Sequence, residues 1–258
     1  MMDREILYVV LPCYNEEDNI RELVLEWKNQ ESRLEKKNIN LRLIVVNDGS
    51  SDNTLNIIKS LERYYDNVEV LDHVTNQGLG EALNTGINYV ISQKNKGFLC
   101  IMDADLTHRP YYVHSMIDKL KEEKLECVIA SRYRRGSKVE GLSLIRKLLS
   151  YLARIVYTFT LSIKDVRDYT CGYRLYETEA LKVLAEKYNG KIIRERSFAC
   201  MMELLFKFDN EGFKIGEVPF VLKYQLKGGK SKMRVFKTAN RSLLLIGKLK
   251  KLVNEGIV

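Results

Sequence analysis

Residues 98–105 read FLCIMDAD, an apolar run that ends in two aspartates one residue apart, Asp103 and Asp105. A short apolar run bounded by polar residues predicts a buried strand, and polar residues at its exit predict a ligand site at the carboxyl edge of a parallel sheet. Two carboxylates there can hold a hard divalent cation that takes phosphate oxygens as its other ligands. In the competing interpretation, one aspartate caps the helix that begins near Pro110 and the other is solvated.

The rest of the chain alternates short β-branched runs with amphipathic segments. This alternation predicts an α/β fold, in which a mostly parallel sheet is flanked by helices. Expected strands cover residues 6–11, 41–46, 68–71, 98–102 and 127–130. Between the first two strands, apolar residues recur with helical spacing from about Glu17 onward. After Arg132 the pattern changes to a long amphipathic segment, two helices and one late strand over residues 215–222, which we interpret as an acceptor-facing part.

Length and composition set broader limits. The 258 residues suit one elaborated domain, and we expect a catalytic domain over residues 1–235 followed by a helical tail over residues 236–258. Five cysteines without CxxC pairing indicate neither a disulfide framework nor a zinc site, and they fit a reducing cytosol. The N-terminus lacks the order of a signal peptide, and no uncharged stretch reaches the roughly 20 apolar residues of a membrane span. The formal charge of +8 favours anionic partners: phosphates, nucleic acid or acidic lipid.

Polar loops follow the first two expected strands. In VVNDGSSD, Gly49 lets the chain turn sharply, so that the carboxylate of Asp48 can face a bound nucleoside, whereas Asp52 is better explained as a helix cap. In PCYNEED, Pro12, Tyr14 and Glu16 can seat a nucleobase, with the ring stacking and the carboxylate accepting base N–H groups. The alternative for Glu16 is an ordinary position in the first turn of a helix.

Cationic residues follow the strand that ends near residue 130. Arg132 is the first candidate for a phosphate ligand, because the planar guanidinium suits bidentate contact, while Arg134 and Arg135 can equally be solvated loop charges. Further on, Asp168 and Arg174 bracket the sequence TCGY. A structural ion pair between these two residues is the alternative to a role in the reaction.

Seven motifs taken together resemble the family 2 glycosyltransferases with the GT-A fold. Within that family the resemblance is to the branch of dolichyl-phosphate mannosyltransferases and polyprenyl-phosphate glycosyltransferases. The motifs are LPCYNEEDNI, VVNDGSSDNT, NQGLGEALNTG, IMDADLTHRP, ASRYRRG, DYTCGYRLY and IGEVPFVLKYQLKGGKSKM, in the order of the family and over about residues 10–235. A joint match of this kind is far more specific than any single motif.

The resemblance implies a nucleotide-sugar donor, Mg²⁺ or Mn²⁺ on Asp103 and Asp105, and inversion at the anomeric carbon. It favours GDP-mannose, with UDP-glucose and UDP-N-acetylglucosamine as rivals. The donor-binding residues that it implies are Pro12, Tyr14, Glu16, Asn47, Asp48, Gly80, Asp103 and Ala104. The implied catalytic residues are Asp103, Asp105, Arg132, Asp168, Arg174 and Lys232. The chain departs from the family pattern at Asn47, Thr107, Arg109 and Leu226, where the family usually has aspartate, glutamine, proline and arginine.

The acceptor is expected to be a lipid phosphate. Family members that use hydroxyl acceptors usually carry a Glu-Asp pair that supplies a general base. The Glu-Asp pair of this sequence, Glu17–Asp18, lies in the first loop, and the acceptor-facing half has none. A lipid phosphate is already an anion and needs cations instead. The alternatives are transfer to a saccharide or protein hydroxyl and a catalytically silent nucleotide-binding module. Nucleic acid is disfavoured because acidic residues occupy the expected ligand edge.

The segment 141–163, GLSLIRKLLSYLARIVYTFTLSI, is apolar over most of its length and carries Arg146, Lys147 and Arg154. This composition suits a pair of helices that lie in a membrane interface with the cations on anionic head groups. A buried core helix is the alternative. Together with the cysteines and the N-terminus, the segment predicts a peripheral protein at the cytoplasmic face of a membrane.

Overall fold

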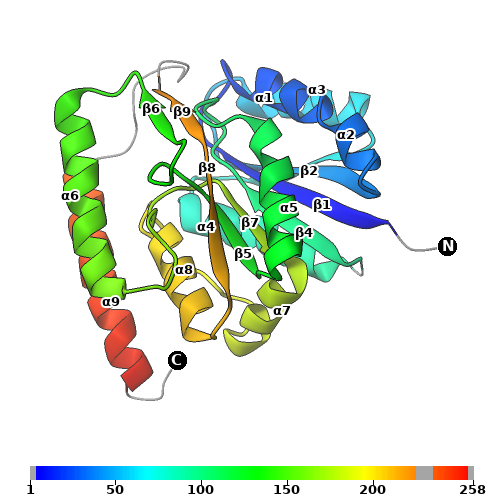
Figure 1. Ribbon diagram of the computed structural model, residues 1–258. Coiled ribbons are helices and arrows are strands. Elements are labelled where there is room, and N and C mark those ends of the chain that lie inside the picture. Colours follow the sequence, from blue (N-terminus) through cyan, green and yellow to red (C-terminus); the bar gives the residue numbers. More distant parts are fainter. Residues whose placement is uncertain (1–3, 94, 225–234, 255–258) are drawn as a thin grey trace.

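The computed structural model describes residues 4–93, 95–224 and 235–254 and has the predicted α/β fold (Figure 1). Its main sheet has seven strands in the order β3-β2-β1-β4-β7-β5-β8. The first half contributes β1 (Glu5–Cys13), β2 (Ile39–Asp48), β3 (Val68–His73), β4 (Gly97–Ile101) and β5 (Cys127–Ser131). The second half contributes β7 (Arg174–Glu177) and β8 (Ile215–Pro219). The five strands expected in the first half are confirmed, and β2 extends two residues further at each end than predicted.

Strands β1 to β4 pair in parallel, and the side chains of β1, β4 and the second half of β2 are buried in nearly continuous runs, whereas most of the edge strand β3 is only half-buried. Such runs are typical of parallel strands, because helices cover both faces of the sheet. The helices of the first half are α1 (Ile20–Lys28), α2 (Glu31–Glu35), α3 (Thr54–Tyr64), α4 (Leu79–Ser92), the 3-10 turn η1 (Pro110–Tyr112) and α5 (Val113–Glu123). Figure 1 shows α5 in front of the sheet and α4 behind it, where α4 packs on β1 and β2.

Strand β7 was not predicted. It is antiparallel to both neighbours and separates β4 from β5. The expected late strand over residues 215–222 is divided: β8 ends at Pro219, and β9 (Val221–Lys223) pairs instead with β6 (Lys138–Glu140) in a small second sheet. Proline has no N–H to continue a ladder, which explains the break. Helices α7 (Thr178–Lys187) and α8 (Cys200–Asn210) precede β8.

The amphipathic segment forms one helix, α6 (Leu144–Leu161), and not the expected pair. Its partner is α9 (Val235–Asn254), which comes from the end of the chain and runs beside it at one side of the molecule (Figure 1). Tyr157 and Leu161 of α6 are buried, and so are Ile246 and Leu249 of α9. Between the helices Lys250 Nζ donates to the carbonyl oxygen of Thr160. No helix among the described residues is long and apolar enough to cross a membrane.

Candidate active site

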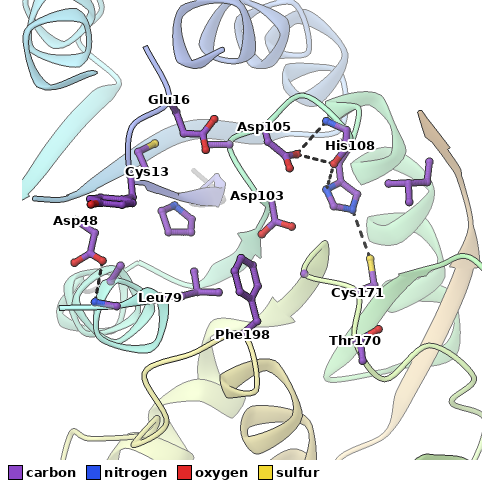
Figure 2. Close-up of a pocket in the computed structure, with 18 of the residues that line it drawn as sticks. Cys13, Glu16, Asp48, Leu79, Asp103, Asp105, His108, Thr170, Cys171 and Phe198 are labelled. Carbon is purple, nitrogen blue, oxygen red and sulfur yellow. Dashed lines mark hydrogen bonds between the residues drawn. The ribbon is translucent and has the colours of Figure 1, made fainter. Parts of the chain in front are cut away.

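A cavity of about 340 Å³ opens where the loops after β1, β2 and β4 meet the loop before β7, a size typical of small-molecule sites (Figure 2). Eight predicted site residues line it: Pro12, Tyr14, Glu16, Asp48, Asp103, Ala104, Asp105 and Arg132. The cavity therefore opens at the carboxyl edge of the sheet, where the polar loops predicted a ligand site. The other lining residues are Cys13, Asn76, Gly78, Leu79, Ala82, Thr107, His108, Thr170, Cys171, Gly172, Phe198, Leu222 and Tyr224.

The carboxylate of Asp48 is 3% exposed and organises the loop after β3. It accepts the backbone N–H groups of Gln77 at 2.8 Å and Gly78 at 2.9 Å. Its Oδ1 also lies 2.9 Å from Nδ1 of His73, whose Nε2 lies 2.9 Å from the hydroxyl of Thr85. Asp48 thus lines the pocket while its oxygens hold Gln77 and Gly78, so it shapes that wall of the pocket.

Short polar side chains join the loops after β1 and β2. The N–H of Asn15 donates to Ser50 Oγ at 3.0 Å, and the N–H of Glu16 donates to Thr54 Oγ1 at 2.8 Å. The N-cap of α3 is Asn53 and not the predicted Asp52, but Asp52 lies one residue earlier and accepts the N–H of Thr54, the first residue of the helix, at 3.0 Å. Burial acts to raise the pKa of Asp52, but its hydrogen bonds from Thr54 and Glu17 outweigh this and lower the pKa below the ordinary value.

Two predicted donor-binding residues do not line the pocket. The side chain of Asn47 is 1% exposed and donates to Asp72 Oδ1 at 2.7 Å, while its own oxygen accepts the N–H of Ser50. Gly80 packs against the segment before α8: a Cβ there would lie 1.9 Å from the carbonyl oxygen of Glu195. Both residues therefore hold the neighbouring segments in place, and the structure does not bring either of them into the lining of the pocket.

Asp103 and Asp105 both line the pocket, in the loop that follows β4. Asp105 is buried and accepts both the N–H and the hydroxyl of Thr107, at 3.2 and 2.6 Å. The loop before β7 approaches Asp103 so closely that a Cβ on Gly172 would lie 3.0 Å from Asp103 Oδ1. Among the described residues, no cluster of three or more His, Cys, Asp or Glu side chains could hold a metal ion. Two pocket carboxylates still fit Mg²⁺ or Mn²⁺, which bind through one or two carboxylates when phosphates supply further oxygens.

At the opposite end of the pocket, Arg132 forms a buried pair with Asp168. Nε and Nη2 of Arg132 lie 2.8 and 2.6 Å from the two carboxylate oxygens, and Nη2 also donates to Thr170 Oγ1 at 2.6 Å. Burial alone would raise the pKa of Asp168, but the charge and hydrogen bonds of Arg132 lower it below its usual value. Within the described part of the chain, Nη1 of Arg132 has no hydrogen-bond partner, and the residue lines the pocket.

The remaining predicted catalytic residues lie elsewhere. Asp168 and Arg174 do not pair with each other. Asp168 is fully buried under Arg132, and Arg174 is also fully buried, with its guanidinium donating to the carbonyl oxygens of Cys171, Met201 and Tyr169 at 2.7–2.9 Å. Arg174 therefore holds the loop before β7 and does not line the pocket. Lys232 and Leu226 lie outside the described residues.

Several lining residues were not predicted as site residues. His108 packs against the rings of Tyr173, edge to face, and Phe220, in a tilted arrangement. Its Nε2 lies 3.7 Å from Cys171 Sγ (Figure 2). Burial raises the pKa of the Cys171 thiol to about 12, so this sulfur stays protonated at neutral pH. Both residues belong to quoted motifs and could have been found there. Phe198, which lies just before α8, belongs to none of the quoted motifs.

Helix α6 reaches the Arg132 end of the pocket through Tyr133. The hydroxyl of Tyr133 lies 2.6 Å from Ser150 Oγ of α6. The guanidinium of Arg154, also on α6, lies 4.9 Å from the centre of the Tyr133 ring, and that of Arg132 lies 5.6 Å from it. Arg154 also lies over Tyr151, so it stacks on aromatic rings rather than pointing freely to the surface.

Comparisons with known proteins agree with this fold. The model of the family described as Glycosyl transferase family 2 matches residues 8–184. The chain is 28% identical to a dolichol-phosphate mannosyltransferase of Pyrococcus furiosus, over 97% of this chain and 67% of that protein. It is 29% identical to a UDP-N-acetylglucosamine–dolichyl-phosphate N-acetylglucosaminyltransferase of Methanococcus voltae, over 95% and 97% of the two chains. The fold matches glucosyl-3-phosphoglycerate synthase of Mycobacterium tuberculosis, solved with Mn²⁺ and UDP, with a TM-score of 0.66 at 18% identity, over 93% and 79% of the chains.

Proposed function

The chain belongs to glycosyl transferase family 2, and from that membership we propose that it transfers a sugar, with mannose favoured, from a nucleotide-sugar donor to a dolichyl-type polyprenyl phosphate, with inversion at the anomeric carbon. One observation carries the proposal: a single pocket holds the two aspartates Asp103 and Asp105 and the guanidinium of Arg132. A donor diphosphate and an acceptor phosphate can therefore meet in it. Relatives named for dolichyl-phosphate transfer support the same acceptor.

The donor lies along the loops after β1, β2 and β4. Pro12, Tyr14 and Glu16 hold the nucleobase end, and Asp48 with Gly78 forms the wall beside the ribose. Asp103 and Asp105 would hold Mg²⁺ or Mn²⁺, which neutralises the charge of the departing diphosphate when bound. The fold neighbour solved with Mn²⁺ supports this choice of metal.

The acceptor phosphate binds at Arg132. Asp168 occupies Nε and Nη2 of that guanidinium and so fixes its plane, which leaves Nη1 to meet an incoming phosphate. Charge-assisted hydrogen bonds of this kind are about twice as strong as neutral ones. In the same loop Arg134 pairs with Glu217 at 2.7 Å, and Arg135 is exposed and does not line the pocket, so Arg132 is the best candidate of the three arginines.

No side chain acts as an obligatory base in this proposal. Asp168 is fully buried, and its oxygens accept N–H groups from Arg132 and Cys171. Such a carboxylate is a poor proton acceptor, because its charged form is already stabilised. The Glu-Asp pair Glu17–Asp18 is exposed and does not line the pocket. A phosphate monoester has a second pKa near 6, so above that pH it arrives ionised and needs no base.

The membrane contact is formed by α6. Its exposed apolar side chains recur with helical spacing: Leu144, Leu148, Tyr151, Leu152, Ile155, Val156 and Phe159. A stripe of this kind suits burial at the head-group level, on the cytoplasmic face of a membrane. Because α6 contacts Tyr133 and Tyr133 adjoins Arg132, a lipid phosphate held at this surface would lie at the Arg132 end of the pocket.

The decisive experiment is turnover followed by mass spectrometry. The purified chain is incubated with Mn²⁺ or Mg²⁺, GDP-mannose or UDP-N-acetylglucosamine, and either a short-chain polyprenyl phosphate or an oligosaccharide. We expect a polyprenyl-phosphate hexose as the product, with GDP-mannose as the better donor. Glycosylation of the oligosaccharide alone would replace the proposal with transfer to a hydroxyl. Preference for UDP-N-acetylglucosamine would change the sugar and leave the acceptor in place.

A further inference from the structure

One wall of the pocket is apolar and lies outside both the loops after β1, β2 and β4 and the loop with Arg132. It consists of Leu79 and Ala82 at the start of α4 and Phe198 just before α8. Figure 2 shows the ring of Phe198 beside Leu79 and below Asp103, with Thr170 and Cys171 on its other side. The side chain is 38% exposed, which is unusual for a phenylalanine inside a site otherwise built of polar loops.

The segment that carries Phe198 has no regular secondary structure but is firmly held by buried polar groups. Asn84 of α4 bonds to both backbone groups of Ile193, at 2.5 and 2.9 Å. Glu203 of α8, 1% exposed, accepts the N–H groups of Arg194 and Glu195 at 2.9 and 2.8 Å. Lys207 joins this network through Glu203 Oε1 at 2.7 Å. Satisfied buried networks rigidify the segments that they join.

Two glycines bring this segment against the start of α4. Gly78 has φ +94°, and a Cβ there would lie 2.7 Å from the carbonyl oxygen of Arg196. That same oxygen accepts the N–H of Gly80 at 3.2 Å. The backbone two residues before Phe198 is thereby fixed to the helix that supplies Leu79. The ring is presented to the pocket in a defined place.

We propose that Phe198 is a specificity-determining residue whose ring forms the platform for the hexosyl group of the donor. This inference rests on the proposed function. If Asp103 and Asp105 hold the diphosphate and Arg132 holds the acceptor, the sugar lies between them. Phe198 lies below Asp103, and Thr170, which accepts a hydrogen bond from Arg132, lies on its other side (Figure 2). A pyranose ring presents C–H groups on its faces, and an aromatic face offers them an apolar surface with negative potential.

The same ring is placed to assist the transfer. In the transfer, an oxygen of the acceptor phosphate forms the new bond to the anomeric carbon while the bond from that carbon to the diphosphate oxygen breaks. The electron pair of the broken bond leaves with the nucleoside diphosphate, and the sugar gains oxocarbenium character in the transition state. An aromatic face attracts positive charge close to it. Phe198 should therefore favour the transition state over the bound donor, and its loss should lower kcat as well as donor affinity.

The test compares nucleotides with and without their sugar. GDP, GDP-mannose, UDP and UDP-N-acetylglucosamine are titrated by calorimetry with Mn²⁺ into the full chain, Phe198→Ala, Phe198→Tyr and the exposed control Tyr64→Ala. We expect Phe198→Ala to bind the preferred nucleotide sugar about three- to tenfold more weakly, the range that one aromatic contact supplies. Binding of the corresponding nucleoside diphosphate should be unchanged, and Phe198→Tyr and Tyr64→Ala should match the parent.

Three outcomes would overturn the inference. Equal weakening of the diphosphate and the nucleotide sugar would assign Phe198 to the nucleotide or to folding, which thermal melting of the variants separates. Unchanged affinity and unchanged kcat in Phe198→Ala would leave the ring without a role. If the parent chain binds no nucleotide sugar at all, the proposed function itself fails, and that result is read from the parent before any variant is compared.

Discussion

The two ends of the pocket are built by different means. At the donor end, loops that follow the parallel strands β1 and β2 bond to one another through short polar side chains and backbone N–H groups. At the acceptor end, the loop before antiparallel β7 is held by buried charges: Arg132 with Asp168, and Arg134 with Glu217. The donor end depends on several hydrogen bonds between neutral groups, whereas the acceptor end depends on a few pairs of opposite charges, although both join residues more than 30 positions apart in sequence.

The sharpest test of this difference is Asp168→Asn. Removing one partner of a buried pair leaves an unpaired charge, so we expect a loss of about 3–5 kcal/mol in the free energy of unfolding. As a control, Asp118→Asn breaks an exposed pair with Lys37 and should cost no more than about 1 kcal/mol. Urea denaturation measures both. Similar values for the two variants would show that burial does not set the strength of the Arg132 pair.

The pH dependence of Asp168→Asn follows from the lowered pKa of Asp168. A carboxyl whose pKa is lower in the folded state stabilises the fold above its unfolded pKa, near 3.9, and loses this contribution as the pH falls through the folded value. The difference between parent and variant should therefore be constant near neutrality and shrink below about pH 4. In the range above pH 6, kcat of the variant should keep the shape of the parent's profile, because Asp168 is not a base.

At the shared centre of the pocket, Asp105→Ala should remove metal-dependent donor binding, and Asp103→Ala should weaken it. Loss of the charge stabilisation that the metal supplies should lower kcat/KM by about a hundredfold or more in Asp105→Ala. Calorimetric titration of the donor with and without Mn²⁺ measures the dependence, and the exposed Asp66→Ala serves as a control. Unchanged metal dependence in both pocket variants would refute the assignment of the metal.

Substitutions on the exposed face of helix α6 should have a smaller effect, and this effect should be on membrane binding alone. Replacing Leu148, Leu152 and Phe159 by Gln should reduce liposome flotation at least about tenfold, since each apolar side chain buried contributes roughly 1.5–3 kcal/mol. The melting temperature should not change, because all three side chains are exposed. The matched control replaces exposed Leu25, Tyr64 and Val183, which lie on other helices. Equal flotation of both triple variants would place the membrane contact elsewhere.

The smallest effect is expected for Gly172→Ala. The added methyl group would lie 3.0 Å from Asp103 Oδ1 and must displace the loop or the carboxylate slightly. We expect the affinity for Mn²⁺ in the presence of donor to fall about tenfold at most, as for other changes in the surroundings of metal ligands. Gly247→Ala, where a Cβ meets nothing within 4 Å, is the control. An unaltered metal titration in Gly172→Ala would mean that the two loops are less tightly fitted.

The sequence by itself determined where the loops at the donor end of the pocket lie. The loops with Pro12, Asp48 and Asp103 follow apolar strands directly, and parallel strands bring their carboxyl ends to one edge whatever the rest of the chain does. Position along the chain was therefore enough to predict position in the pocket. The same logic did not predict that Asn47 and Gly80 lie outside the lining of the pocket, because a sequence motif does not show which of its residues face a cavity.

The acceptor end was decided by tertiary structure. Arg132 and Asp168 are separated by 36 residues, and their pairing depends on β7, whose four residues carry no strand pattern. The carbonyl partners of Arg174 were not predicted, because an arginine that donates to backbone carbonyl oxygens looks the same in sequence as one that binds an anion. The places of Phe198 and α9 were not predictable for the same reason. Phe198 lines the pocket beside Leu79, and α9 packs on α6 and α8, so the neighbours of each come from distant parts of the chain. Local patterns encode which strand a loop follows, and only packing brings such distant groups together.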